Sequence, residues 1–88
     1  MTEGEATIVN RLGLHARPSA RLTALATKYK AEIWLTKNNR RVNAKSIMGV
    51  MMLAAARGST LRIEAEGPDA QEAVVALQAL IRSGFDEE

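Results

Sequence analysis

His15 is the only histidine of the chain, and it lies in the segment Gly13-Leu14-His15-Ala16-Arg17-Pro18-Ser19. Proline fits the first turn of a helix and not its interior, so Pro18 predicts that a helix begins just after His15. The free N–H groups of a helix start bind anions, and the Arg17 guanidinium adds positive charge. Both features also favour the neutral, nucleophilic imidazole. His15 is therefore a candidate to accept a phosphoryl group and hold it.

A second interpretation of His15 is purely structural. An ordinary surface histidine can stand at a helix start, with Arg17 as a solvated charge, and short motif matches of this kind often occur by chance. The position of His15 alone leaves both interpretations open.

The length and composition exclude several classes of protein. The 88 residues predict a single domain, residues 1–88, with one core and little room for a deep substrate pocket. The chain has no cysteine, so it has neither a disulfide framework nor a thiolate nucleophile, and one histidine makes a zinc site improbable. We expect no metal, no other cofactor and no enclosed active site.

The N-terminal residues and the apolar runs indicate a cytoplasmic protein that stays out of membranes. Residues 1–5 are acidic and polar, which is the opposite of a secretory signal. The longest nearly apolar run, residues 47–56, is about half as long as a bilayer span requires.

Charge is distributed unevenly along the chain. Residues 1–57 carry ten Lys and Arg against three Asp and Glu, whereas residues 58–88 carry two against seven. A basic half that contains His15 attracts acidic protein surfaces. It also raises the question of nucleic acid, but Trp34, Tyr29 and Phe85 are the only aromatic residues and are scattered, so no base-stacking surface is apparent. We expect protein partners and no nucleic acid.

The hydrophobic pattern predicts the order βαββαβα. The expected strands are residues 5–10, 31–37, 41–43 and 60–66, and Trp34 points away from the face of Ile33 and Leu35. The first helix has an apolar stripe at residues 18, 22, 25 and 29, and the second runs from an N-cap at Ser46 to before Gly58. The third has Asp69 and Glu72 as a capping box and continues to Gly84. These elements predict an α+β fold with helices on one side of an antiparallel sheet.

Two segments resemble the signatures of HPr, the histidine phosphocarrier family of the bacterial phosphoenolpyruvate-dependent phosphotransferase system. Residues 13–18, Gly-Leu-His-Ala-Arg-Pro, resemble the active-site signature. Residues 45–53, Lys-Ser-Ile-Met-Gly-Val-Met-Met-Leu, resemble the regulatory-serine segment, at the expected separation. With the length and the element order, the resemblance covers nearly the whole chain.

The resemblance implies a carrier rather than an enzyme. His15 would accept phosphate from enzyme I through Nδ1 and pass it to a IIA protein or domain, with Arg17 and the backbone amides of Ala16 and Arg17 on the phosphate. Ser46 would match the serine phosphorylated by HPr kinase/phosphorylase. The implied fold is an open-faced β-sandwich, a four-stranded antiparallel sheet in the order 1-4-2-3 with three helices on one face. We expect a monomer.

The methionine-rich second helix is apolar on every side, which a small domain cannot bury completely. Val50 and Leu53 are expected to face the sheet. Methionine fills core gaps as readily as it suits a docking surface, so the residues alone leave a buried helix open as well. With the resemblance, we favour a docking patch made of Ala16, Pro18, Ala20, Arg21, Ile47, Met48 and Met51.

Three alternatives concern Ser46, the tail and the class of function. Ser46 is also explained as a structural N-cap. Residues 83–88 are similar to the tail of the nitrogen-related paralogues, so the chain could serve the sugar branch or the nitrogen-related branch. A purely regulatory interaction module, in which His15 and Ser46 are sensed states, is the other class of function.

Overall fold

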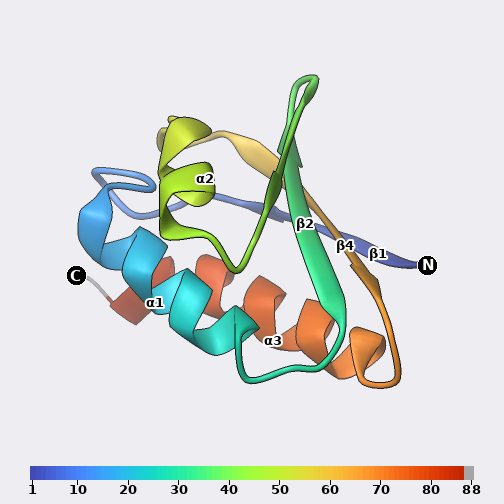
Figure 1. Cartoon of the computed structure of the whole chain (residues 1–88). Coiled ribbons are helices and arrows are strands. Elements are labelled where there is room, and N and C mark those ends of the chain that lie inside the picture. Colours follow the sequence, from blue (N-terminus) through green and yellow to red (C-terminus); the bar gives the residue numbers. More distant parts are fainter. Residues whose placement is uncertain (87–88) are drawn as a thin grey trace.

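The computed structural model describes residues 1–86, which fold into one antiparallel sheet with helices on one side (Figure 1). The strands are β1 (Thr2–Thr7), β2 (Glu32–Lys37), β3 (Arg40–Asn43) and β4 (Thr60–Glu66), in the order β1-β4-β2-β3. The helices are α1 (Ala16–Ala26), α2 (Ile47–Met52) and α3 (Ala70–Arg82), followed by the 3-10 turn η1 (Gly84–Asp86). The expected fold class, element order and strand order are confirmed.

The core lies between the sheet and the helices. Ile33 and Leu35 of β2 lie beside Ala65 and Ile63 of β4 in the antiparallel register. Alternation places these side chains on one face, where α3 covers them. The buried face of α3 is a single stripe, formed by Ala70, Ala73, Val74, Leu77 and Ile81.

Trp34 lies on the uncovered face of the sheet, as predicted. The Arg41 guanidinium lies 4.3 Å from the centroid of its ring. Arg41 also forms an ion pair with Glu64, with Nε and Oε1 3.3 Å apart. On this face of the sheet, the Arg41 guanidinium is paired both with the indole ring of Trp34 and with the carboxylate of Glu64.

The first strand begins earlier than its apolar pattern predicts. The prediction was residues 5–10, and β1 is Thr2–Thr7. Its inward positions include Gly4, where an added Cβ would lie 2.6 Å from Nε2 of Gln78 because α3 packs so closely. A glycine gives no apolar signal, so periodicity misses this half of the strand. Ile8 follows the strand and is buried.

The second helix is shorter than predicted, ending at Met52 rather than just before Gly58. Ala54 takes a positive φ of 50°, which breaks the helix. The carbonyls at this end accept hydrogen bonds from the side chains of the β2–β3 hairpin. Lys37 Nζ donates to Ala54 O at 3.2 Å, and Arg40 Nη1 donates to Met52 O at 3.0 Å. Long-range contacts of this kind leave no trace in local sequence.

The expected capping box of α3 is wrong. Asp69 occupies the N-cap position, but its side chain makes no capping bond. Its carboxylate instead accepts hydrogen bonds from the backbone N–H groups of Lys30, at 2.9 Å, and Ala31, at 2.8 Å. These bonds, chiefly that from Lys30, hold the pKa of Asp69 below its ordinary value. Asp69 therefore ties the connection after α1 to the start of α3.

The C-terminal end of α3 also departs from prediction. The helix ends at Arg82, not Gly84, and the chain turns so that the side chain of Phe85 is fully buried. The stripe of α1 is rotated as well: Pro18, Ser19, Leu22, Thr23 and Ala26 are buried, Leu25 is half-buried and Tyr29 lies beyond the helix. The buried face of α1 includes the small polar residues Ser19 and Thr23. A pattern that considers apolar residues alone therefore predicts the wrong position for this face.

Candidate functional site

His15 stands at the N-cap of α1, at the end of the loop that follows β1. Its backbone is extended, with φ −79° and ψ −169°, and its carbonyl accepts a hydrogen bond from Ser19 N at 3.0 Å. The half-buried side chain makes no capping bond to the helix. Pro18 has no N–H, so the helix start presents two amides that α1 itself does not use, those of Ala16 and Arg17.

The loop that carries His15 is tied at several points. Asn10 Nδ2 donates to Gly13 O at 2.8 Å, and Gly13 N donates to Asn10 O at 3.2 Å. Leu14 N donates to Ala55 O at 2.9 Å, and Ser19 Oγ donates to Leu14 O at 3.1 Å. These hydrogen bonds fix the backbone on both sides of His15, so the site is preorganised. Sequence reasoning missed Asn10 and Ser19, because neither carries a motif of its own.

Gly13 is required by the close approach of two segments. Its φ is +68°, and an added Cβ would lie 2.3 Å from Ala55 O and 2.9 Å from Ala56 Cα. No side chain fits that space, and the backbone conformation favours glycine independently. The segment that follows α2 is thus packed directly against the loop that precedes His15.

Arg17 is exposed on the first turn of α1, one residue beyond Ala16. Within residues 1–86 its side chain makes no hydrogen bond or ion pair. A guanidinium in this state can move to meet an anion at His15 without first breaking another contact. The structure therefore places the imidazole of His15, two backbone amides and the exposed side chain of Arg17 at the same helix start.

The predicted docking residues of α2 lie on the surface. Exposed fractions are 44% for Ile47, 72% for Met48 and 38% for Met51, whereas Val50 and Leu53 are buried, as expected. The helix α2 packs against α1, which carries the exposed residues Ala16 and Ala20. Met52, at the end of the same helix, is also exposed but is not among the predicted docking residues. We call the exposed set Ala16, Ala20, Ile47, Met48 and Met51 the apolar patch.

Pro18 does not belong to that surface. Its side chain is fully buried, so the prediction that it contributes to docking is wrong. The ring fits the first turn of the helix, and the packing of α1 against the rest of the domain buries it.

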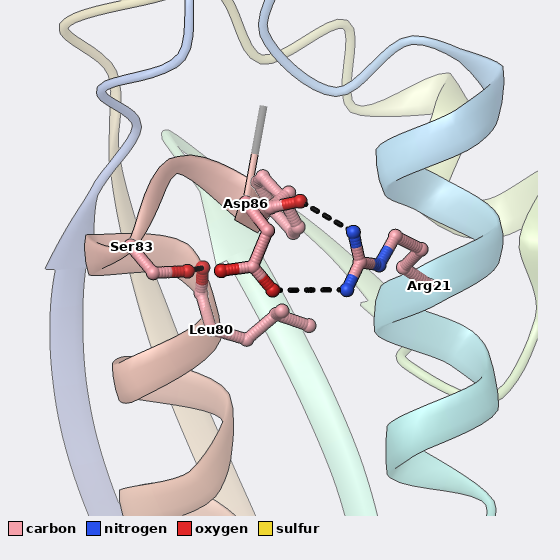
Figure 2. Close-up of polar contacts among 5 residues, drawn as sticks. Arg21, Leu80, Ser83 and Asp86 are labelled. Carbon is pink, nitrogen blue, oxygen red and sulfur yellow. Dashed lines mark hydrogen bonds and ion pairs between the residues drawn. The ribbon is translucent and has the colours of Figure 1, made fainter. Parts of the chain in front are cut away.

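Arg21 is held by the C-terminal turn, as Figure 2 shows. Its Nη1 donates to Phe85 O at 2.7 Å, and its Nη2 donates to Asp86 Oδ2 at 3.0 Å. In the same turn, Ser83 Oγ donates to Leu80 O at 2.7 Å. Arg21 is exposed, as the docking prediction requires, but it also anchors η1 to α1.

Ser46 caps α2, which confirms the structural part of its prediction. Its Oγ accepts a hydrogen bond from Gly49 N at 3.1 Å, and α2 begins at the next residue, Ile47. Ser46 is half-buried. The hydroxyl oxygen therefore stabilises the helix that displays Ile47 and Met48.

Comparison with known proteins decides the family. Residues 2–83 match the family described as PTS HPr component phosphorylation site. The chain belongs to the HPr family. HPr proteins are the phosphocarriers of the phosphotransferase system.

Individual relatives agree with this assignment. Phosphocarrier protein HPr of Cupriavidus necator is 55% identical over 87 residues, covering 99% of this chain and 98% of that protein. Phosphocarrier protein NPr of Shewanella violacea is 39% identical over 85 residues, covering 97% and 93%. A crystal structure of HPr from Thermoanaerobacter tengcongensis has a TM-score of 0.96 at 48% identity, covering 100% and 99%, and another structure of HPr from that organism is described as a dimer.

Of the helices formed by residues 1–86, none has the length and apolar character to cross a bilayer.

Proposed function

We propose that this HPr-family protein accepts a phosphoryl group from enzyme I on Nδ1 of His15 and passes it to a IIA protein or domain. It acts as a carrier in a transfer chain and catalyses no turnover of its own. One observation carries the proposal: His15 occupies the N-cap of α1 without capping it, beside the two amides that the helix does not use. We propose the cytoplasm as its compartment and a monomer as its working form.

The transfer step follows from this geometry. The lone pair of the neutral ring nitrogen attacks phosphorus, a P–N bond forms, and the bond from phosphorus to the donor breaks. The transferred group carries negative charge, which the amides of Ala16 and Arg17 and the Arg17 guanidinium stabilise. Reversal of the same step delivers the group to the acceptor, so one environment serves both halves of the transfer.

Docking would use the apolar patch together with its basic surroundings. Arg17 and Arg21 are exposed on α1, on the same helix as Ala16 and Ala20. Apolar surface buried between the two proteins stabilises the complex. Basic side chains at the edge of the contact speed association with an acidic partner surface. Enzyme I and IIA proteins would then present acidic, apolar surfaces to the same region in turn.

Ser46 is proposed as a regulatory phosphorylation site, with HPr kinase/phosphorylase as the modifying enzyme. A phosphate at the N-terminal end of α2 is tolerated by the helix, because its oxygens still face backbone N–H groups. It adds negative charge next to Ile47 and Met48 and weakens docking to an acidic partner. Phosphorylation of Ser46 would therefore leave the fold intact and slow docking to the partner.

The sugar branch is the preferred setting. Higher identity to a protein named HPr than to one named NPr supports this choice over the nitrogen-related branch. The acceptor would then be a IIA component of sugar uptake.

The test is incubation with enzyme I and labelled phosphoenolpyruvate. We expect acid-labile label on the protein and none on His15→Ala, whereas Ala24→Ser, a small change at an exposed position of the same helix outside the apolar patch, retains it. Absence of label with a competent enzyme I would overturn the carrier proposal and leave a regulatory module. Subsequent transfer to purified sugar-branch and nitrogen-branch IIA proteins separates the two branches. Light scattering during the transfer reports the oligomeric state.

A further inference from the structure

Sulfur is distributed unusually in this molecule. The chain has no cysteine and four methionines, and three of the four lie on the six-residue helix α2. Their exposed fractions are 72% for Met48, 38% for Met51 and 58% for Met52. Met1 is also exposed, but it precedes β1, at the end of the sheet far from α2 (Figure 1).

We propose that Met48, Met51 and Met52 form a reversible oxidation site, at which conversion to methionine sulfoxide weakens partner docking. The proposal rests on the function proposed above, because it concerns the surface that enzyme I would contact. With peroxide as the oxidant, the thioether sulfur attacks one peroxide oxygen, an S–O bond forms and the O–O bond breaks. Sulfur loses two electrons, the peroxide is reduced, and water leaves. Sulfoxide reductases reverse the change.

The absence of thiols in the sequence directs the chemistry to these residues. Cysteine thiolates usually react with peroxide before methionine does, and here the sequence holds none. Among the thioethers, exposure decides access, and Met48 is the most exposed large apolar residue of the patch. Oxidation would therefore begin within the apolar patch, at Met48.

The architecture of α2 separates the effect on docking from the effect on stability. The residues through which α2 joins the core are Val50 and Leu53, which contain no sulfur. The helix is held at its start by Ser46 and at its end by Lys37 and Arg40. A sulfoxide oxygen on the outer face thus meets water in the free protein and leaves these contacts in place.

Oxidation lowers the affinity for a partner because the partner covers the oxidised surface on binding. A sulfoxide is a strong hydrogen-bond acceptor, and burying it against an apolar partner surface without a donor is unfavourable. One such group buried in the contact lowers the second-order rate of phosphoryl transfer by about tenfold. The loss falls on KM, because His15 and its amides are unchanged.

The experiment compares reduced, peroxide-treated and reductase-repaired protein in transfer from enzyme I, with mass spectrometry locating each added oxygen. We expect about a tenfold rise in KM after oxidation of α2, recovery after repair, and an unchanged thermal midpoint. The variant Met48→Leu/Met51→Leu/Met52→Leu keeps the surface apolar but has no thioether on α2, so its own KM should be the same before and after peroxide. Met1→Leu is the matched control and should remain peroxide-sensitive.

Each outcome decides the proposal. Equal KM for reduced and oxidised protein overturns it, and so does a triple leucine variant as sensitive as the unmodified chain, since the lesion then lies elsewhere. If reduced protein takes no label at all, the carrier function fails. Calorimetric binding of enzyme I to reduced and oxidised protein then still shows whether oxidation controls docking.

Discussion

The helices α2 and α3 differ in how much of their apolar surface they bury. The 13 residues of α3 bury a continuous apolar stripe against the sheet, and the other side of the helix carries both polar and apolar residues. The six residues of α2 bury only Val50 and leave Ile47, Met48, Met51 and Met52 in solvent. Burial stabilises α3 directly, whereas α2 depends on hydrogen bonds at its two ends. Because α2 exposes most of its apolar side chains, it is stabilised by hydrogen bonds from Ser46, Lys37 and Arg40 rather than by its own burial.

The largest expected effect is the loss of core packing under α3. Leu77 is fully buried, and Leu77→Ala should lower the free energy of unfolding by about 2–5 kcal/mol. Val75 lies on the same helix but is 56% exposed, and Val75→Ala should stay within about 0.5 kcal/mol of the unmodified chain. Urea denaturation measures both, and equal losses would contradict the assigned stripe.

The next effect concerns the contact between the His15 loop and the segment after α2. Gly13→Ala combines a positive φ with a collision against Ala55, and should cost about 2–4 kcal/mol. Gly58 also has a positive φ, but an added Cβ there meets nothing within 4 Å, so Gly58→Ala should cost about 1 kcal/mol. Thermal and urea unfolding compare the pair. A Gly13 variant no less stable than the Gly58 variant would remove the proposed close approach.

Replacing the cap of α2 should have a moderate effect. Ser46→Ala removes the oxygen that accepts from Gly49 N and should cost about 1 kcal/mol. Ser46→Asp keeps an acceptor at the helix start, so its stability should match that of the unmodified chain while phosphoryl transfer from enzyme I slows. Denaturant melts and transfer rates are both needed. If Ser46→Asp transferred at the normal rate, the regulatory proposal for Ser46 would fail.

The smallest effect is a change in pH dependence at the start of α3. The pKa of Asp69 is lowered in the folded state, so its contribution is present above the unfolded value, near 4, and is lost as pH falls through the folded value. Asp69→Asn should lower stability at neutral pH and flatten the acid limb of the stability profile. Glu72→Gln, in the first turn of the same helix, is the control and should leave that limb intact. Matching profiles for the two variants would contradict the Asp69 bridge.

Elements whose contacts are local are predicted better from sequence than elements that depend on distant partners. Periodicity and a proline place the start of α1 at Ala16, and clean alternation places β4 at residues 60–66. The cap at Ser46 is correct because its hydrogen bond is local. Asp69 was assigned the same role and instead bonds to a segment nearly forty residues away, at Lys30 and Ala31. Local rules fail where a polar side chain has a tertiary partner.

The site shows the same division. The motif around His15 predicts the helix start and its amides, because both are features of neighbouring residues. Pro18 was assigned to the docking surface, but whether a side chain faces out is decided by how α1 packs, and that packing buries it. Gly13 against Ala55 and the bonds from Lys37 and Arg40 to the end of α2 join distant segments. None of these contacts has a local signature.

The stacked pair on the uncovered face of the sheet has a practical consequence. Trp34 is the only indole of the chain, and it lies under Arg41 on the side of the sheet that the helices do not cover. Its ultraviolet emission therefore reports whether the sheet is intact, and a partner seated over α1 and α2 should leave that emission unchanged. The protein contains its own fluorophore, placed so that unfolding and complex formation give separate optical signals.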